Sequence, residues 1–278
     1  MRGSARATVV LHGDLVDFLP VRRGPGDVTP DAAGAAAPAT PVVLERRFEG
    51  TPSAKDVLEA AGVPHPEVAA LAVNGLPAGL DRRLGDGDRV EAWPAAEAAR
   101  LGLPPAVPST PDHAEPRFVL DGHLGRLAAY LRMLGFDTWY RNDAGDAELA
   151  AVAAADGRIL LTRDRGLLRR SIIRRGACVR SDRPFDQLVE IVRRYHLARR
   201  WQPFGRCLRC NAELVIATRE EVLDRLLPLT RIHYDDFRRC PGCDAVYWKG
   251  SHHARMGRLV ERVRAAAVVD PPADGCRR

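Results

Sequence analysis

The sequence lacks the long apolar runs that place a chain in or across a membrane. No stretch of its 278 residues approaches the ~20 uninterrupted apolar residues that a membrane-spanning helix needs. The first twenty residues also lack the apolar centre of a secretory signal, because Val, Leu and Phe alternate there with Asp and His. We therefore expect a cytoplasmic protein with no membrane partner.

Lysine is nearly absent, so that arginine supplies almost all of the positive charge. The net charge of +6 is also uneven: residues 1–100 carry 11 Lys and Arg against 14 Asp and Glu, and residues 101–278 carry 31 against 22. A basic C-terminal part suits a polyanionic partner, because Arg and Lys release counterions from phosphate backbones. A coding bias towards Arg, Ala, Gly and Pro explains the same composition, so charge alone leaves nucleic-acid binding open.

The first 95 residues have the pattern of a small α+β domain. Alternating apolar and polar residues predict strands over 7–19 and 42–48, and residues 24–41, almost all Gly, Ala, Pro, Asp and Thr, predict a flexible loop between them. Ser53 can cap a helix over 54–61, strands are expected over 70–73 and 88–93, and Asn74-Gly75 predicts a turn. This order of elements is typical of a β-grasp.

Three segments of this domain resemble the small sulfur-carrier ubiquitin-like proteins, namely residues 53–58, 73–75 and 84–90. Those proteins work through a C-terminal Gly-Gly, whereas this domain lacks it and continues beyond Trp93-Pro94. We therefore expect a docking or regulatory module with a protein partner, and keep sulfur-carrier or modifier chemistry as the weaker alternative.

Residues 96–116 are rich in Pro, Ser, Thr and Ala and read as an interdomain linker. Beyond them, apolar runs alternate with segments of helical spacing, as in βαβ units with a mainly parallel sheet. We therefore expect an α/β domain over 117–200, with strands at 118–120, 136–140, 159–161 and 177–179 and helices at 123–134, 146–155, 167–173 and 185–195.

Four acidic residues follow these predicted strands: Asp121, Asp146, Asp164 and Asp182. Ligand sites of open α/β sheets lie outside the carboxyl ends of the strands, so we expect the four carboxylates on one rim. Clustered carboxylates are stable chiefly around a divalent cation, and hard cations such as Mg²⁺ and Mn²⁺ prefer oxygen ligands. In a basic surface such a site predicts phosphodiester hydrolysis.

Each acidic residue has a predicted role and an alternative one. Asp121 and Asp164 are expected as direct ligands, Asp146 as a ligand or bridge, and Asp182 as a second-site ligand. Asp146 is alternatively the N-cap of its helix, Asp182 a turn residue, and Asp143 or Glu148 the second acid. The residues expected to bind substrate around this rim are Arg126, Arg163 and Arg165. His123 is either structural or part of the site.

Cys207-x-x-Cys210 and Cys240-x-x-Cys243 are separated by 29 residues. Two such pairs predict a closed, tetrahedral zinc site of the structural kind, whereas redox chemistry would explain one pair but not two. We expect a zinc ribbon over 201–258, followed by a helix end and tail over 259–278. Cys178 is expected in the core, and Cys276 in the polar tail.

Residues 247–253, YWKGSHH, mix aromatic, basic and imidazole groups. Tyr247 and Trp248 are predicted either to stack on unpaired bases or to pack the ribbon, and His252 and His253 either to contact phosphates or to be solvated. Of these, Trp248 and His252 are the expected substrate-binding residues.

Residues 118–138, FVLDGHLGRLAAYLRMLGFDT, are similar to the opening of the Mut-seven carboxy-terminal RNase family, as are 146–149, 157–164 and 179–182. The resemblance implies a PIN-like nuclease domain followed by a zinc ribbon, with a ubiquitin-like domain in front in some bacterial members. It also implies cleavage of single-stranded RNA by a metal held on Asp121, Asp146 and Asp164. The leading hypothesis is thus a metal-dependent (endo)ribonuclease. The alternative is a non-catalytic RNA- or ribosome-binding adaptor that uses the ribbon and the basic surface.

Overall fold

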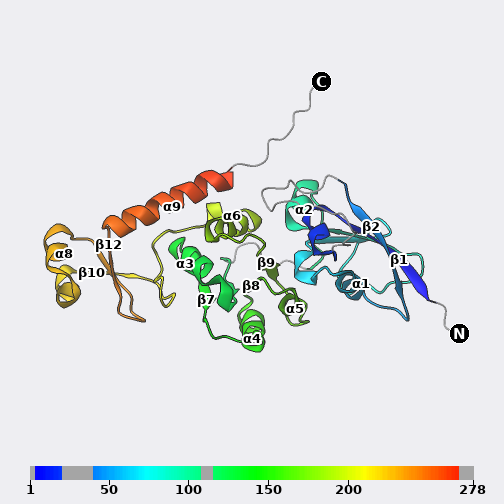
Figure 1. Cartoon of the computed structure of the whole chain (residues 1–278), viewed down its shortest axis with the longest axis horizontal. Coiled ribbons are helices and arrows are strands. Elements are labelled where there is room, and N and C mark those ends of the chain that lie inside the picture. The colour runs from blue at the N-terminus through cyan, green and yellow to red at the C-terminus, as the bar shows by residue number, and fades with distance from the viewer. Residues whose placement is uncertain (1–3, 21–39, 108–114, 269–278) are drawn as a thin grey trace, which may run out of the picture. The chain divides into compact units, whose positions relative to one another are not determined.

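The computed structural model describes residues 4–20, 40–107 and 115–268 (Figure 1). The predicted loop over 24–41 lies almost wholly outside these residues, as does Cys276. The chain forms two compact units, one of residues 1–114 with 164–178 and the other of residues 115–163 with 179–278.

The first unit contains a five-stranded mixed sheet in the order β2-β1-β5-β3-β4, with β1 and β5 parallel and the other neighbours antiparallel. This is the predicted β-grasp, and its helix α1 buries one face, which includes Val57 and Leu58. The elements of the unit are β1 (Ala5–Leu11), η1 (Gly13–Phe18), β2 (Val42–Phe48), α1 (Ala54–Ala61), η2 (His65–Glu67), β3 (Ala70–Val73), β4 (Leu76–Pro77), β5 (Arg89–Trp93), α2 (Ala95–Leu101), α5 (Arg165–Leu168) and β9 (Gly176–Cys178).

Local chemistry explains the elements that were predicted correctly. Ser53 and Asp56 form a reciprocal capping box that starts α1, and Gly62 ends the helix with a φ of 112°. Asn74 and Gly75 both have positive φ, 52° and 77°, as a type I′ turn between β3 and β4 requires.

Two predictions in this region were wrong. Residues 13–18 form the 3₁₀ helix η1 and not the second half of a strand, because Leu15 and Phe18 reach the core at a spacing of three. Residues 95–101 form the helix α2 at the start of the predicted linker, since this Ala-rich stretch lies between Pro94 and a left-handed Gly102.

Residues 164–178 belong to the first unit through buried polar contacts. The imidazole of His65 donates from Nε2 to the carbonyl of Ile173 at 2.6 Å, and the amide of Cys178 donates to the carboxylate of Glu67 at 2.6 Å. Glu67 is fully buried. The predicted nuclease domain therefore contributes this segment to the unit that contains the β-grasp.

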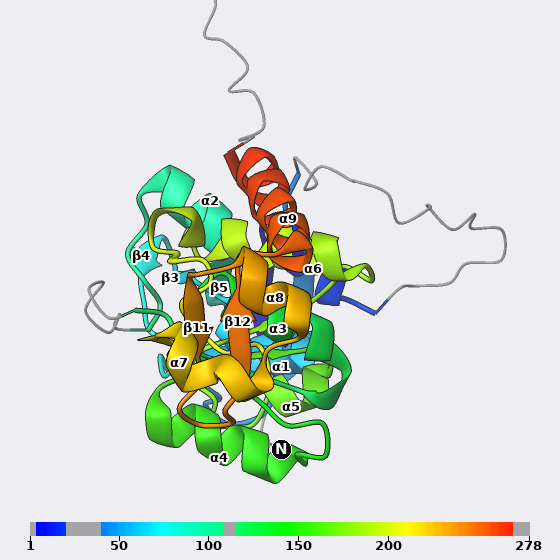
Figure 2. The ribbon, with the colours of Figure 1, turned by 90° about the vertical axis from the view of Figure 1, so that its left-hand side faces the viewer.

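The second unit combines a parallel sheet in the order β7-β6-β8 with an antiparallel three-stranded sheet in the order β10-β11-β12. Figure 2 shows β11 and β12 side by side, with α7 and α8 next to them. The elements are β6 (Phe118–Leu120), η3 (Gly122–Leu124), α3 (Gly125–Met133), β7 (Thr138–Tyr140), α4 (Asp146–Asp156), β8 (Ile159–Thr162), α6 (Pro184–Arg194), η4 (Leu197–Arg199), β10 (Val215–Ala217), α7 (Arg219–Val222), η5 (Leu223–Arg225), α8 (Pro228–His233), β11 (Phe237–Arg239), β12 (Val246–Trp248) and α9 (Ser251–Val268).

The core of the parallel sheet follows from its apolar strands. All of β6 and the apolar residues of β8 are buried, and α4 packs on both strands, while α3 packs on β7 and buries Leu127 and Leu131. The last helix, α9, packs on α6, where the Arg262 guanidinium lies 4.6 Å from the centre of the Phe185 ring. The predicted α/β architecture with a mainly parallel sheet is confirmed, and residues 265–268 of the predicted tail are helical.

Candidate functional site

The first acidic position, Asp121, directly follows β6 and is buried, with 7% of its surface exposed. One carboxylate oxygen, Oδ2, accepts the hydroxyl of Thr162 and, at 3.0 Å, the amide of Arg163. The other, Oδ1, accepts the amide of His123 at 2.9 Å. A carboxylate offers about four lone-pair positions, so these three donors leave one on Oδ1 for a further ligand.

The strand register produces this arrangement. Strands β6 and β8 are parallel neighbours with Leu120 opposite Leu161, so that Thr162 stands opposite Asp121. Thr162 was not predicted as a site residue, although the sequence contains the signal: it is a hydroxyl at the end of an otherwise apolar, buried strand.

The loop after β7 lies against the backbone that follows Asp121. The Tyr140 hydroxyl donates to the carbonyl of Gly122 at 2.9 Å. A Cβ at Gly122 would lie 2.7 Å from the Asn142 carbonyl oxygen, so only glycine fits there. The loop that leads to Asp146 is thus held at the carboxyl end of β6.

Three acids lie in or just after that loop, Asp143, Asp146 and Glu148, and two of them form ion pairs with the same arginine. Arg141 contacts Asp143 at 2.9 Å and Glu148 at 2.8 Å, and hydrogen bonding to Arg141 lowers the pKa of Asp143. Asp146 is exposed, and its carboxylate makes no hydrogen bond or ion pair within the described residues. It is also the first residue of α4, whose N-cap is Gly145, so the alternative reading of Asp146 as N-cap was wrong by one position.

The fourth acid pairs with a predicted substrate-binding residue. Arg163 contacts the exposed Asp182 at 2.6 Å. The turn that carries Asp182 is fixed by two residues of α6 that were not predicted from the sequence: Glu190 accepts the amide of Ser181 at 3.0 Å, and Gln187 donates to the Ser181 carbonyl. Their spacing of three in a helix, with Gln187 buried, was the available signal.

Asp164 and Arg165 belong to the first unit. One carboxylate oxygen of Asp164 accepts the amide of Gly166 at 2.6 Å and caps α5, which repeats the local geometry of Asp121 with His123. The guanidinium of Arg165 lies 4.9 Å from the centre of the Phe18 ring and donates to the Asp17 and Phe18 carbonyls. Its contacts are thus structural. Arg126, also predicted to bind substrate, is exposed on α3.

The carboxylates do not form a tight cluster. Within the described residues, the four cysteines bring their ligand atoms within 4.8 Å of one another. No other group of three or more His, Cys, Asp or Glu side chains among these residues does so. Mg²⁺ commonly binds through one or two carboxylates and keeps several waters, so a tight triad of acids is not a requirement.

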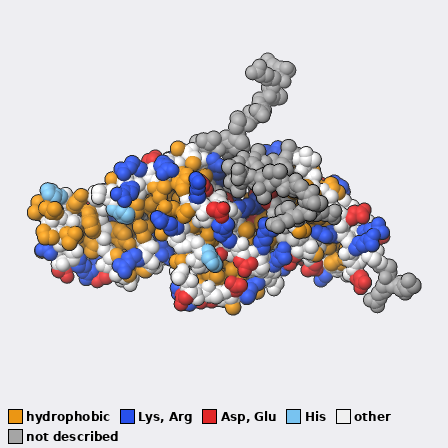
Figure 3. Space-filling view, in the orientation of Figure 1, with side chains coloured by type: hydrophobic (Ala, Val, Ile, Leu, Met, Phe, Trp, Pro, Cys, Tyr) orange, Lys and Arg blue, Asp and Glu red, His pale blue; other side chains and the backbone are white. Residues whose placement is uncertain are grey.

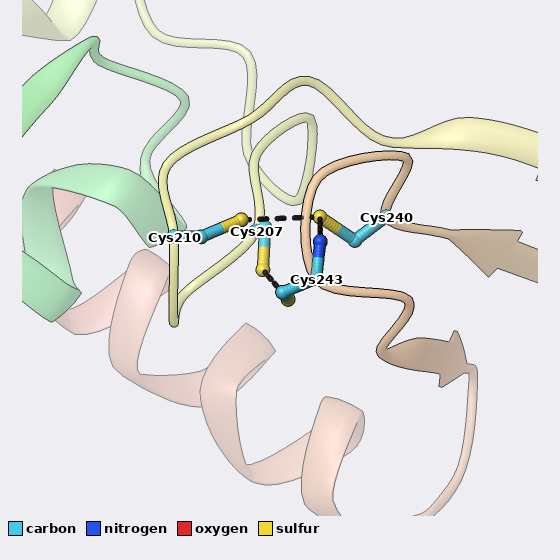
Figure 4. A group of neighbouring side chains, drawn as sticks. All are labelled: Cys207, Cys210, Cys240 and Cys243. Carbon is cyan, nitrogen blue, oxygen red and sulfur yellow. Dashed lines mark hydrogen bonds between the residues drawn. The ribbon is translucent and has the colours of Figure 1, made fainter.

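The four cysteines, in contrast, point their sulfur atoms at one another (Figure 4). Cys207 Sγ lies 3.5 Å from Cys243 Sγ, and Cys210 Sγ lies 3.2 Å from Cys240 Sγ. Four sulfurs at about 2.3 Å from a tetrahedral Zn²⁺ stand at comparable separations. The donor set therefore fits zinc, and it leaves no position for water.

Both cysteine pairs use the same backbone turn. The amides of Asn211 and Asp244 donate to the carbonyls of Cys207 and Cys240, at 3.0 and 2.9 Å, and both residues have positive φ. Asn and Asp tolerate this conformation better than other side chains, which explains their place after each C-x-x-C.

The electrostatics of the cluster call for a cation. Burial acts to raise the pKa of Cys207, but hydrogen bonds from the Tyr247 hydroxyl and backbone amides outweigh it and lower the pKa to about 6. A backbone hydrogen bond from Ala212 acts to lower the pKa of Cys210, but partial desolvation and its three cysteine neighbours outweigh it and raise the pKa to about 12. Four neighbouring thiolates coexist only when a positive ion offsets their charge.

The first cysteine turn is bonded to the parallel sheet. Arg132, 5% exposed, donates to the carbonyls of Thr138, Leu208 and Arg209. Asn211 donates to Asp137 at 2.7 Å. The ribbon and the α/β core are therefore joined by hydrogen bonds as well as by the chain.

Asp137 should give this junction a pH dependence. Burial acts to raise its pKa, but Arg158, at 2.7 Å, and Asn211 outweigh burial and lower the pKa below 3.8. Asp137→Asn should therefore cost about 1–3 kcal/mol at pH 7. This deficit should persist down to about pH 4 and shrink below it, as wild-type Asp137 becomes protonated.

Urea unfolding at pH 7, 5 and 3 measures that difference. Asp156→Asn is the matched control, because Asp156 contacts the same Arg158 at 2.9 Å but is much more exposed. Equal effects of the two substitutions at every pH would contradict the role given to Asp137.

The aromatic segment lies in the ribbon. Trp248 packs against the buried cluster of Ala217, Val222, Leu226 and Phe237, and also lines a cavity. His252 is exposed at the start of α9, whereas its neighbour His253 lines the cavity. Both predicted roles of the tryptophan, packing and access to a ligand, are thus compatible with its position.

Comparisons with known proteins address the chain as a whole. The family model described as the Mut7-C RNAse domain matches residues 116–260, and the model described as Mut7-C ubiquitin matches residues 35–100. No curated protein and no solved structure gives a match. No described helix combines the length and the apolar character that crossing a membrane requires.

Proposed function

Because the chain belongs to the Mut7-C RNAse domain family, whose model matches more than half of it, we propose that it is a metal-dependent ribonuclease acting on single-stranded RNA. The observation that carries the proposal is Asp121, a buried carboxylate at the carboxyl end of a parallel strand with one lone-pair position unused. Such a group is costly to bury without a compensating partner, and a divalent cation provides one.

Asp121 and Asp146 are the ligands that the second unit offers, since Arg141 occupies the competing acids Asp143 and Glu148. Asp164, two residues beyond the end of β8, is the third proposed ligand. A bound Mg²⁺ or Mn²⁺ would neutralise charge on the scissile phosphate. It would also lower the pKa of a water molecule, so that hydroxide is available to attack the phosphorus.

Arg163 is the residue proposed to hold the substrate phosphate. Its ion pair with Asp182 is exposed on both sides, and exposed pairs contribute little to stability, so an incoming phosphate can displace Asp182. Asp182 is then available as the ligand of a second cation. His123 Nδ1 lies 3.6 Å from Asp121 Oδ1, so that its imidazole borders the proposed site.

The four cysteines are proposed to hold a structural Zn²⁺. All four ligands are sulfur and two of them, Cys207 and Cys240, are completely buried, so this ion would stabilise the ribbon and take no part in hydrolysis.

The direct test measures cleavage of fluorescently labelled single-stranded RNA by the full chain with Mg²⁺, with Mn²⁺ and with neither. We expect cleavage with either ion, none without, and slower cleavage of a double-stranded RNA of the same sequence. Equal rates with and without divalent ions would contradict the proposal. Sequencing the product ends separates endonucleolytic from exonucleolytic cleavage.

A second function, an RNA- or ribosome-binding adaptor, is favoured by the spacing of the acids, because no three described carboxylates come within 4.8 Å of one another. It predicts RNA binding that is unaffected by removal of divalent ions and no cleavage under any condition above. The unused lone-pair position on Oδ1 of Asp121 favours the ribonuclease over the adaptor.

The ubiquitin-like domain is proposed to bind a protein partner. Its last strand, β5, continues through Pro94 into α2, so that it presents no terminal Gly-Gly for sulfur transfer. We propose that the protein acts in the cytoplasm, where RNA substrates are present.

A further inference from the structure

A cavity of about 260 Å³ lies in the zinc ribbon, outside the carboxylate rim. Its walls include Phe204, Tyr247 and His253 together with Arg238 and Lys249. The volume is close to the lower end of the range of about 300–1,000 Å³ that small-molecule sites occupy. Aromatic rings beside cationic side chains are the combination that binds unpaired nucleotides.

The aromatic wall is held in place before any ligand arrives. Phe204 has a φ of 65°, a conformation that bulky residues rarely adopt, and its amide is fixed by the carbonyl of Met133 at 2.8 Å. Its ring lies 4.2 Å from the ring of His253 at a tilt of 41°. Tyr247 is anchored through its hydroxyl, 3.1 Å from Cys207 Sγ. Such strain is retained where the position of a side chain matters.

The polar groups around the rings favour an anionic ligand. The guanidinium of Arg238 is exposed and makes no hydrogen bond or ion pair within the described residues. Lys249 contacts Asp236 at 2.6 Å, but both are exposed, so this pair is easily displaced. Figure 3 shows basic side chains among apolar ones over this end of the second unit.

His253 supplies neutral hydrogen-bonding groups. Burial is the larger cause that lowers the pKa of His253, and the positive charge of nearby Lys249 lowers it further. The imidazole is therefore uncharged at neutral pH. In that form it has one donor and one acceptor, as the edge of a nucleobase does.

We propose that this cavity binds one unpaired base of a single-stranded RNA. The base stacks on Phe204, and the flanking phosphate contacts Arg238 and Lys249. This inference rests on the proposed ribonuclease function and deepens it, because it assigns a second RNA contact away from the hydrolytic rim.

Binding is tested with zinc-loaded full-length protein in an Asp121→Asn background, which leaves the RNA intact, by anisotropy of a labelled twelve-nucleotide single strand. Phe204→Gly removes the ring and suits the left-handed backbone, and should weaken binding by roughly tenfold to a hundredfold. Arg238→Glu should weaken it by about tenfold and lower the slope of log affinity against log salt by about one to two. The matched control is Arg258→Glu, an equal charge change at an exposed position of α9 that does not line the cavity.

Crosslinking with 4-thiouridine gives an independent readout, because it should label residues 203–206 or 247–256. The proposal is overturned if both cavity variants bind RNA as the Arg258→Glu control does, or if crosslinks form only elsewhere. If the wild-type protein does not cleave RNA but the cavity binds it, only the ribonuclease function is overturned. If the wild-type protein cleaves RNA but the cavity does not bind it, only this inference is overturned.

Discussion

Replacing Asp121 by asparagine is expected to lower the rate of RNA cleavage at least a hundredfold. The carboxamide keeps the size of the side chain, but only its oxygen can accept the Thr162 hydroxyl and the Arg163 amide. Its NH₂ group must then occupy the position of Oδ1, where a cation is proposed to bind. Removal of a group that organises charge at a phosphoryl centre commonly costs about 10²–10³ in rate.

The measurement compares initial rates of cleavage at saturating Mn²⁺, alongside the thermal unfolding midpoint of each variant. Asp156→Asn is the control, since Asp156 ends α4, away from the carboxyl ends of the strands. If the Asp121→Asn protein folds normally and cleaves RNA at the wild-type rate, Asp121 is not a ligand of the catalytic cation.

Replacing Cys240 by serine is expected to have the largest effect on stability. Cys240 is completely buried, and its sulfur also accepts the amide of Cys243 at 3.4 Å. Binding of structural zinc to small domains supplies about 10–16 kcal/mol, which is folding free energy for a ribbon with few buried apolar residues. We expect zinc content to fall from one ion per chain to nearly none, with rapid proteolysis within residues 201–258.

The damage should extend beyond the ribbon, because Arg132 and Asp137 bond to its first cysteine turn. Proteolysis mapped by mass spectrometry should therefore also show cuts near β7. Cys178→Ala is the control, since Cys178 lies in β9 and outside the four-cysteine group. Full zinc content and normal protease resistance in Cys240→Ser would contradict a structural metal site.

The parts of the fold that could be predicted from the sequence are those in which one local rule determines the structure. Ser53 with Asp56 predicts the start of a helix, Asn74-Gly75 a turn, and two C-x-x-C pairs a four-sulfur cluster. In each case the residues that make the structure are neighbours in the chain or carry a metal-binding spacing. The place of Asp121 also follows from a local rule, because it directly follows a short buried strand, whereas its role as a metal ligand stays a prediction.

Long-range contacts were beyond local rules. The sequence places Asp143, Asp146 and Glu148 together, and only the folded chain shows that Arg141 takes the first and the third. It also does not reveal that Arg163 faces Asp182, or that Arg165 lies against the Phe18 ring. Alternation failed at residues 13–18, because the buried residues Leu15 and Phe18 are three apart, a spacing that fits a short helical turn and not a strand with one buried face.

The most direct test of the ribonuclease is a crystal of the full chain soaked in Mn²⁺ and measured for anomalous scattering. We predict a peak at about 2.2 Å from Oδ1 of Asp121, and its disappearance in Asp121→Asn crystals. A strong anomalous signal at other sites, with none at Asp121, would contradict the claim that this carboxylate holds the catalytic cation.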